Sequence, residues 1–202
     1  MFPADKPPYP GLRPFERDES HLFFGRDHCL DDMIKRLAER RFLAVLGSSG
    51  TGKSSLVRTG LFTALEMGLM PDASSRWLIV DFKPGGNPLG NLARALLEAE
   101  CAVTKKPLPG ALEVTSLQER FKQEGRRELI KWCREGHLAE GTNLLVLVDQ
   151  FEELFRYQNA DGREDAQALV TLLLESRWPR GLASPQRAEI PICAPSIWAP
   201  AR

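Results

Sequence analysis

Apolar and polar positions follow two periods along the chain, and together these predict alternating strands and helices. Short runs at 42–46, 77–82 and 144–148, which are apolar apart from Asp81, are typical of strands buried in a parallel sheet. After each run, apolar residues recur every three or four positions, which predicts helices, the last of them over 165–175. This alternation favours an α/β fold with three layers and a mostly parallel sheet.

Capping residues predict where several helices begin and end. Asp27 has the side chain of an N-cap, and Asn87 followed by Pro88 has the composition of a second helix start. The spacing of Ser116 and Glu119 matches a capping box, which predicts the start of a short helix there. Gly68 is expected to end the helix that follows the first strand.

Both ends of the chain lack a regular period. Residues 1–20 are rich in proline and are expected to be an extended lead-in, whereas 21–176 carry the strand and helix patterns. Residues 177–202 contain five prolines, at positions 179, 185, 191, 195 and 200, so a central strand is not expected there. The sequence therefore predicts a three-layer core that is incomplete at its carboxyl end, an irregular tail, and an uncovered edge on the strand at 144–149.

The turn after the first strand carries the most informative motif. It reads Gly47-Ser48-Ser49-Gly50-Thr51-Gly52-Lys53-Ser54, which is the G-x-x-x-x-G-K-S pattern of a phosphate-binding P-loop, or Walker A motif. Glycines allow the backbone amides to approach phosphate, and the lysine supplies a positive charge. We expect the loop and Ser55 to bind ATP or ADP, and the Ser54 hydroxyl to ligate Mg²⁺.

A second motif ends the apolar run at 144–148. Asp149 follows that run directly, as the magnesium-binding aspartate of a Walker B motif does. Glu152 and Glu153 come next, and either carboxylate could polarise an attacking water molecule. We therefore predict a metal site formed by Ser54 and Asp149, with Glu152 and Glu153 as the candidate catalytic bases.

Composition narrows the classes of protein that remain. Of 202 residues, 27 are Lys or Arg and 27 are Asp or Glu, so the formal net charge is zero and no basic stripe for nucleic acid is indicated. The four cysteines show no metal-ligand spacing, and no apolar run approaches the ~18 residues of a membrane span. We expect free cysteines and a cytoplasmic location.

Four stretches together resemble one known family. They are Pro8-Tyr9-Pro10-Gly11-Leu12-Arg13-Pro14-Phe15, Phe23-Phe24-Gly25-Arg26, the P-loop with Ser54-Ser55-Leu56-Val57-Arg58, and Asp149-Gln150-Phe151-Glu152-Glu153-Leu154-Phe155. In these stretches the chain is similar to the novel STAND NTPase 1 family, whose members are signal-transduction ATPases with numerous domains, and the resemblance covers roughly residues 8–176.

The resemblance implies an ATP-binding switch module of the P-loop fold. Related modules are joined to sensor repeats or effector domains, so protein partners and nucleotide-dependent oligomerisation are expected. Phe24-Gly25-Arg26 resembles the box near the adenine of such ATPases. The run from Asp149 is also similar to the extended Walker B motif of NACHT ATPases, which favours Glu153 over Glu152 as the base.

The resemblance ends after Ser176, where related chains continue into a further core strand with a sensor residue. Three alternatives follow: a regulatory ATPase module, which we favour, another kind of P-loop enzyme, or a non-catalytic interaction fragment of a larger protein. A GTPase would carry an N-K-x-D motif, which the chain lacks. A small-molecule kinase remains open, although the acidic pair after Asp149 argues for activation of water.

Overall fold

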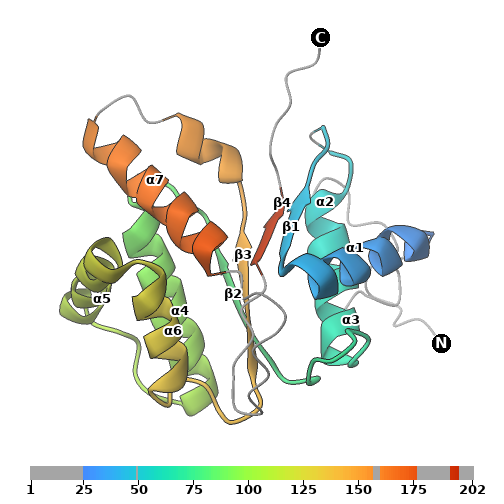
Figure 1. The fold of residues 1–202 in the computed structure, drawn as a ribbon, viewed down its shortest axis with the longest axis horizontal. Coiled ribbons are helices and arrows are strands. Elements are labelled where there is room, and N and C mark those ends of the chain that lie inside the picture. The colour runs from blue at the N-terminus through green and yellow to red at the C-terminus, as the bar shows by residue number, and fades with distance from the viewer. Residues whose placement is uncertain (1–24, 49, 157–159, 177–191, 196–202) are drawn as a thin grey trace, which may run out of the picture.

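The molecule is built on a four-stranded parallel sheet. A computed structural model describes residues 25–48, 50–156, 160–176 and 192–195. The strands lie in the order β1-β4-β3-β2, and each neighbouring pair is parallel (Figure 1). Their bounds are β1 (Phe42–Val45), β2 (Trp77–Phe82), β3 (Asn143–Val148) and β4 (Ile192–Pro195). The three strands predicted from apolar runs are confirmed, each to within one residue.

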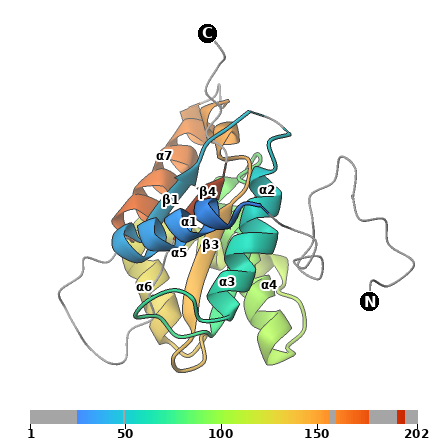
Figure 2. The same cartoon turned by 90° about the vertical axis from the view of Figure 1, so that its right-hand side faces the viewer.

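Helices cover both faces of this sheet, as Figures 1 and 2 show from two directions. One face carries α1 (Asp27–Arg40) and a continuous helix made of α2 (Lys53–Ser55), the π-helical stretch η2 (Leu56–Leu61) and α3 (Phe62–Glu66). The other face carries α4 (Pro88–Thr104), α5 (Ala111–Glu124), α6 (Arg126–Arg134) and α7 (Ala160–Glu175), while the 3₁₀ helix η3 (Phe151–Phe155) follows β3. The predicted α/β class with three layers is confirmed.

Strand β3 joins the two hydrophobic cores. All six of its residues are buried. Leu144, Val146 and Val148 pack into the core beneath α4 to α7, whereas Leu145 and Leu147 pack into the core beneath α1, η2 and α3. Each fully buried leucine or valine stabilises the fold by about 1.5–3 kcal/mol. The position just after β3 is therefore held by packing on both sides.

The expectation that residues 177–202 contain no core strand is wrong. Residues Ile192–Pro195 form β4, which lies between β1 and β3. Prolines 191 and 195 bracket the three residues between them instead of interrupting them, so three consecutive amides remain for pairing. Strand β3 consequently has a partner on each side, and the predicted uncovered edge of β3 is also wrong.

Two predicted helix starts also differ from the structure. Helix α1 begins at Asp27 itself, with Arg26 in the N-cap position and no capping hydrogen bond from a side chain. Helix α5 begins at Ala111, five residues before Ser116, and Glu113 accepts a 2.8 Å hydrogen bond from the Gly110 amide. Ser116 and Glu119 therefore have the spacing of a capping box but lie inside α5, which begins at Ala111.

The predicted start of α4 and the predicted end of α3 are confirmed. Asn87 accepts a 3.1 Å hydrogen bond from the Gly90 amide, and Pro88 occupies the first helical position. After α3, Gly68 adopts a φ of 77° and the next amide bonds back to Ala64. Both cases rest on contacts within a few residues, which a sequence pattern describes well. The predicted lead-in over 1–20 lies outside the described residues.

Candidate nucleotide-binding site

The loop from Gly47 to Gly52 joins the carboxyl end of β1 to the first turn of α2. Gly50 and Gly52 have φ values of 79° and 80°, a region that favours glycine. A side chain at Gly47 would meet the Thr51 hydroxyl oxygen at 3.1 Å. The loop leads directly into a helix that runs from Lys53 to Glu66, and a helix amino terminus favours a negatively charged ligand. Ser49 lies outside the described residues.

The side chain of Lys53 folds over this loop. Its ammonium donates hydrogen bonds to the carbonyl oxygens of Gly47 at 2.8 Å and of Ser48 at 2.9 Å. The Thr51 hydroxyl also donates to the Ser48 carbonyl, at 2.9 Å. The two bonds from Lys53 hold its positive charge beside the loop, where it is available to a phosphate group. Ser54 is half-buried and Ser55 is buried in the first helical turn.

Asp149 lies at the same edge of the sheet as this loop. Leu43 is level with Cys193, and Cys193 is level with Leu147. Two residues further along, Val45 and Asp149 are therefore level across the sheet, with β4 between them. The Asp149 amide donates to the Phe82 carbonyl at 2.9 Å, which extends the pairing of β3 with β2 by one residue.

An arginine connects Asp149 to the end of β2. Arg58 in η2 donates from Nη2 to Asp149 Oδ2 at 3.0 Å and from Nε to Asp81 Oδ2 at 2.9 Å. Its Nη2 also lies 2.9 Å from Asp81 Oδ2. The other oxygen of Asp149, Oδ1, accepts a 3.0 Å hydrogen bond from the Gln150 amide. Three elements that are distant in the sequence thus meet through one guanidinium.

Burial and charge act in opposite directions on these groups. Burial alone would lower the pKa of Arg58, but the carboxylates of Asp81 and Asp149 outweigh it and raise that pKa above its ordinary value. Burial raises the pKa of Asp81, and the attraction to Arg58 opposes this shift only in part. The guanidinium is therefore firmly charged, and the carboxylates around it are partly withdrawn from water.

The two candidate bases have different surroundings. Glu153 accepts a 3.0 Å hydrogen bond through Oε2 from the Gly85 amide, in the loop between β2 and α4. Glu152 is half-buried, and its Oε2 has no hydrogen-bond partner among the described residues. In a 3₁₀ helix, neighbouring side chains leave the backbone about 120° apart, so the two carboxylates start in different directions.

Sequence reasoning assigned no role to Arg58 or Asp81. Arg58 appeared only within the family motif after the P-loop, and Asp81 only as part of a strand. One signal was available, because Asp81 is an acidic residue near the carboxyl end of an otherwise apolar strand. Arg26, from the motif compared with the adenine box, extends to the Thr51 carbonyl of the P-loop at 3.4 Å. Phe23 and Phe24 lie outside the described residues.

Comparison with known proteins decides the family. The model of the family described as Novel STAND NTPase 1 matches residues 8–190, which is most of the chain. The chain belongs to the novel STAND NTPase 1 family. It is therefore a nucleotide-binding NTPase module. No solved structure matches the chain.

The residues of this STAND NTPase fit a magnesium nucleotide. The P-loop provides glycines where a side chain would be strained, a helix amino terminus and an ammonium group, which suit phosphate. Asp149 provides a carboxylate oxygen at the same edge of the sheet, and Mg²⁺ prefers oxygen ligands. The described residues contain no group of three or more His, Cys, Asp or Glu side chains arranged to hold a metal alone.

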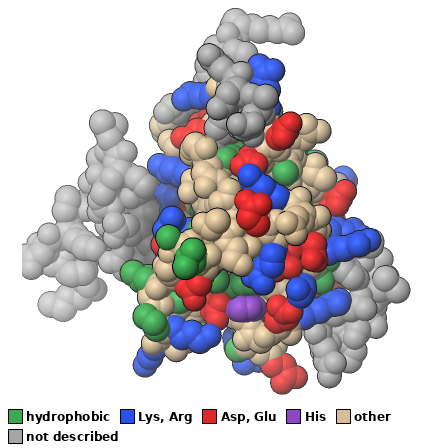
Figure 3. All heavy atoms as spheres, turned by 90° about the vertical axis from the view of Figure 1, so that its left-hand side faces the viewer, with side chains coloured by type: hydrophobic (Ala, Val, Ile, Leu, Met, Phe, Trp, Pro, Cys, Tyr) green, Lys and Arg blue, Asp and Glu red, His purple; other side chains and the backbone are tan. Residues whose placement is uncertain are grey.

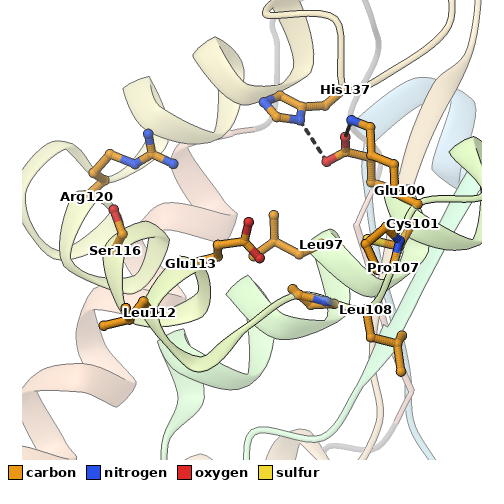
Figure 4. A pocket seen from close by; sticks show the side chains of 12 residues that line it. Leu97, Glu100, Cys101, Pro107, Leu108, Leu112, Glu113, Ser116, Arg120 and His137 are labelled. Carbon is orange, nitrogen blue, oxygen red and sulfur yellow. Dashed lines mark hydrogen bonds and ion pairs between the residues drawn. The ribbon is translucent and has the colours of Figure 1, made fainter.

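A separate hollow of about 520 Å³ lies between α4 and α5 (Figure 4). Glu100 lines it, and the Glu100 carboxylate pairs with Lys106 Nζ at 2.9 Å and with His137 Nδ1 at 2.7 Å. Helix α4 begins beside the carboxyl end of β2, and Glu100 lies twelve residues, or roughly 18 Å, further along it. The hollow is therefore near the amino ends of the strands, whereas the P-loop follows the carboxyl end of β1.

Charges of both signs are mixed on the face formed by α4, α5, α6 and α7. Figure 3 shows Lys and Arg side chains interspersed with Asp and Glu there, without a patch of one sign. No helix in the described part of the chain has the length and apolar character needed to span a membrane.

Proposed function

We propose that this STAND NTPase is an ATP-binding switch module for signal transduction, which binds Mg-ATP and Mg-ADP and, in isolation, hydrolyses ATP slowly or not at all. One observation carries the proposal: a glycine-rich loop at a helix amino terminus lies at the same sheet edge as Asp149. Phosphate recognition and a metal-binding carboxylate are thus available together, at the edge where α/β sheets bind ligands.

Different residues of the site bind the phosphates, the metal ion and the attacking water molecule. The amides of Gly47, Ser48, Ser49, Gly50, Thr51, Gly52, Lys53, Ser54 and Ser55, with the Lys53 ammonium, bind the phosphates. Ser54 and Asp149 hold Mg²⁺, which when bound neutralises charge on the phosphate oxygens. Glu153 orients a water molecule and accepts its proton, and Glu152 is the second candidate for that role.

A switch needs other proteins or domains that respond to the nucleotide bound by the module. We propose that partner proteins or sensor repeats read its nucleotide state, and that the nucleotide influences self-association. A cytoplasmic location is supported by Cys29, Cys101 and Cys133, which are free. Burial raises the pKa of the Cys133 thiol to about 12, so this cysteine is unreactive and belongs to the core.

Thermal stabilisation by a panel of nucleotides tests this proposal. We expect ATP and ADP with Mg²⁺ to raise the melting temperature, and GTP to do so less, because the chain lacks an N-K-x-D motif. In Asp149→Ala, the stabilisation by Mg-ADP should fall to the level seen in EDTA, where the two proteins should agree. Equal stabilisation by Mg-ADP in both proteins would remove Asp149 from the metal site, and none by any nucleotide would contradict the proposal.

A further inference from the structure

We propose that Arg58 occupies the metal-binding carboxylate of Asp149 until a divalent cation arrives, and that Asp81 retains the guanidinium afterwards. Arg58 would thus act as a built-in counter-ion that sets how much Mg²⁺ the site needs. The inference rests on the proposed function, because it takes Asp149 as the Mg²⁺ ligand.

The contacts of Arg58 are divided unequally between its two partners. Nε and Nη2 both lie 2.9 Å from Asp81 Oδ2, whereas Nη2 alone reaches Asp149 Oδ2, at 3.0 Å. When Asp149 is taken by a cation, Arg58 loses one contact and keeps two. The exchange therefore does not leave a partly buried guanidinium without a partner, which would be costly.

Asp149 does not need Arg58 to hold its orientation. Its Oδ1 accepts the Gln150 amide at 3.0 Å, and its own amide is fixed by the Phe82 carbonyl at 2.9 Å. Gln150 is in the left-handed region, with φ 57°, as a tight turn after a strand requires. Backbone contacts thus position the carboxylate, and Arg58 contributes charge rather than orientation.

The charge balance favours exchange over coexistence. Asp81, Asp149 and Arg58 together carry a net charge of −1, which attracts a cation. A divalent cation bound to Asp149 would lie only a few ångströms from the Arg58 guanidinium if that group stayed in place. Repulsion between the two would be strong, because the Asp149 side chain is only 13% exposed and solvent screens it poorly. Binding of Mg²⁺ must therefore include displacement of Arg58 from Asp149.

The local backbone places Arg58 in an unusual segment. Residues Leu56–Leu61 form a π-helical stretch within the helix that follows the P-loop. Such stretches are rare and frequently mark functional sites. The same helix carries Lys53 and Ser54 at its start and Arg58 about one turn later, so one helix positions both the phosphate-binding residues and the guanidinium.

The test is a Mg²⁺ titration of ADP binding, measured by calorimetry on the whole chain. In Arg58→Gln, we expect the Mg²⁺ concentration that gives half of the gain in affinity to fall by about tenfold, because the competing charge is gone. In Asp81→Asn, it should rise severalfold, because Arg58 then has Asp149 as its main partner. Arg36→Gln removes an equal charge from an exposed pair with Asp32 and should match the wild type.

The opposite directions of the two changes distinguish competition from a purely structural role. If Arg58→Gln needs as much Mg²⁺ as the wild type or more, the inference is overturned and Arg58 orients Asp149 instead. If that variant fails to fold, Asp81→Asn decides alone, and an unchanged or lower Mg²⁺ requirement overturns the inference. If the wild type binds ADP with no dependence on Mg²⁺, the assignment of Asp149 to the metal fails, and the inference fails with it.

Discussion

Glu152 and Glu153 are neighbours in the sequence, but the structure gives each its own surroundings. Glu153 is held by the Gly85 amide, so the loop after β2 fixes its position relative to Asp149. Glu152 has a buried oxygen without a hydrogen-bond partner among the described residues, which is unfavourable unless a ligand or water satisfies it. The two residues therefore make separable contributions, which substitution can resolve.

We predict that Glu153→Gln keeps ATP bound and lowers the rate of hydrolysis by about 10²–10⁴, because the amide keeps the shape but cannot accept a proton. Single-turnover hydrolysis, with ATP binding measured in parallel, checks this prediction. Glu152→Gln is the matched control and should hydrolyse ATP at a rate nearer to that of the wild type. Intact turnover in Glu153→Gln together with loss in Glu152→Gln would assign the base to Glu152.

Glu100 is a buried carboxylate with charged neighbours away from the site. Burial alone would raise the pKa of its carboxyl, but hydrogen bonds and charge from Lys106 and His137 outweigh burial and hold that pKa below its ordinary value of 4.5. His137 in turn stacks on Trp132, with ring centroids 4.8 Å apart. A lowered carboxyl pKa stabilises the fold above the unfolded value, and this stability is lost as pH falls through the folded value.

We therefore predict that Glu100→Gln lowers stability at pH 7 by on the order of 1–3 kcal/mol, because the ionised partner of Lys106 and His137 is lost. Below pH ~4.5 the difference between variant and wild type should shrink, since wild-type Glu100 is then being protonated. Melting temperatures across this range are the measurement. Glu98→Gln, on the exposed side of the same helix, is the control. A difference that grows toward low pH would contradict the assigned direction.

At the scale of elements, the sequence predicted what depends on local pattern. The apolar runs of β1, β2 and β3, the Asn87 cap and the glycine loop all follow from residues close together in the chain. Strand β4 could not be predicted in this way. Its three residues between prolines show no period, and the strand is stabilised by pairing with β1 and β3. The contacts of Arg58 join three distant elements, so no local pattern indicates them.

Strand β4 gives a direct prediction for hydrogen exchange. A strand with a partner on each side has its amides directed at one neighbour or the other, so they are shielded alternately by β1 and β3. We expect the amides of Cys193 and Ala194 to exchange as slowly as those of Leu43 and Leu147, with which Cys193 is in register. Rapid exchange at Cys193 and Ala194, with β1 and β3 protected, would contradict the strand order.

At the scale of the whole molecule, the parallel sheet places the residues of the proposed site at the carboxyl ends of its strands. The P-loop, Asp149, Arg58 and the loop after β2 all follow the carboxyl ends of strands or lie one turn beyond them. The hollow bordered by Glu100 lies near the amino ends of the strands. The topology thus brings the residues of the proposed nucleotide site together at the carboxyl ends of the strands.

The most direct test of this account is calorimetric titration of the wild type and of Lys53→Ala with Mg-ADP. Removing the ammonium deletes a charge-assisted contact to phosphate, so the variant should lose about 2–3 kcal/mol of binding free energy or more. Lys35→Ala, on an exposed part of α1, is the control and should bind as the wild type does. Equal affinity in the wild type and in Lys53→Ala would contradict the assignment of the nucleotide site to the P-loop.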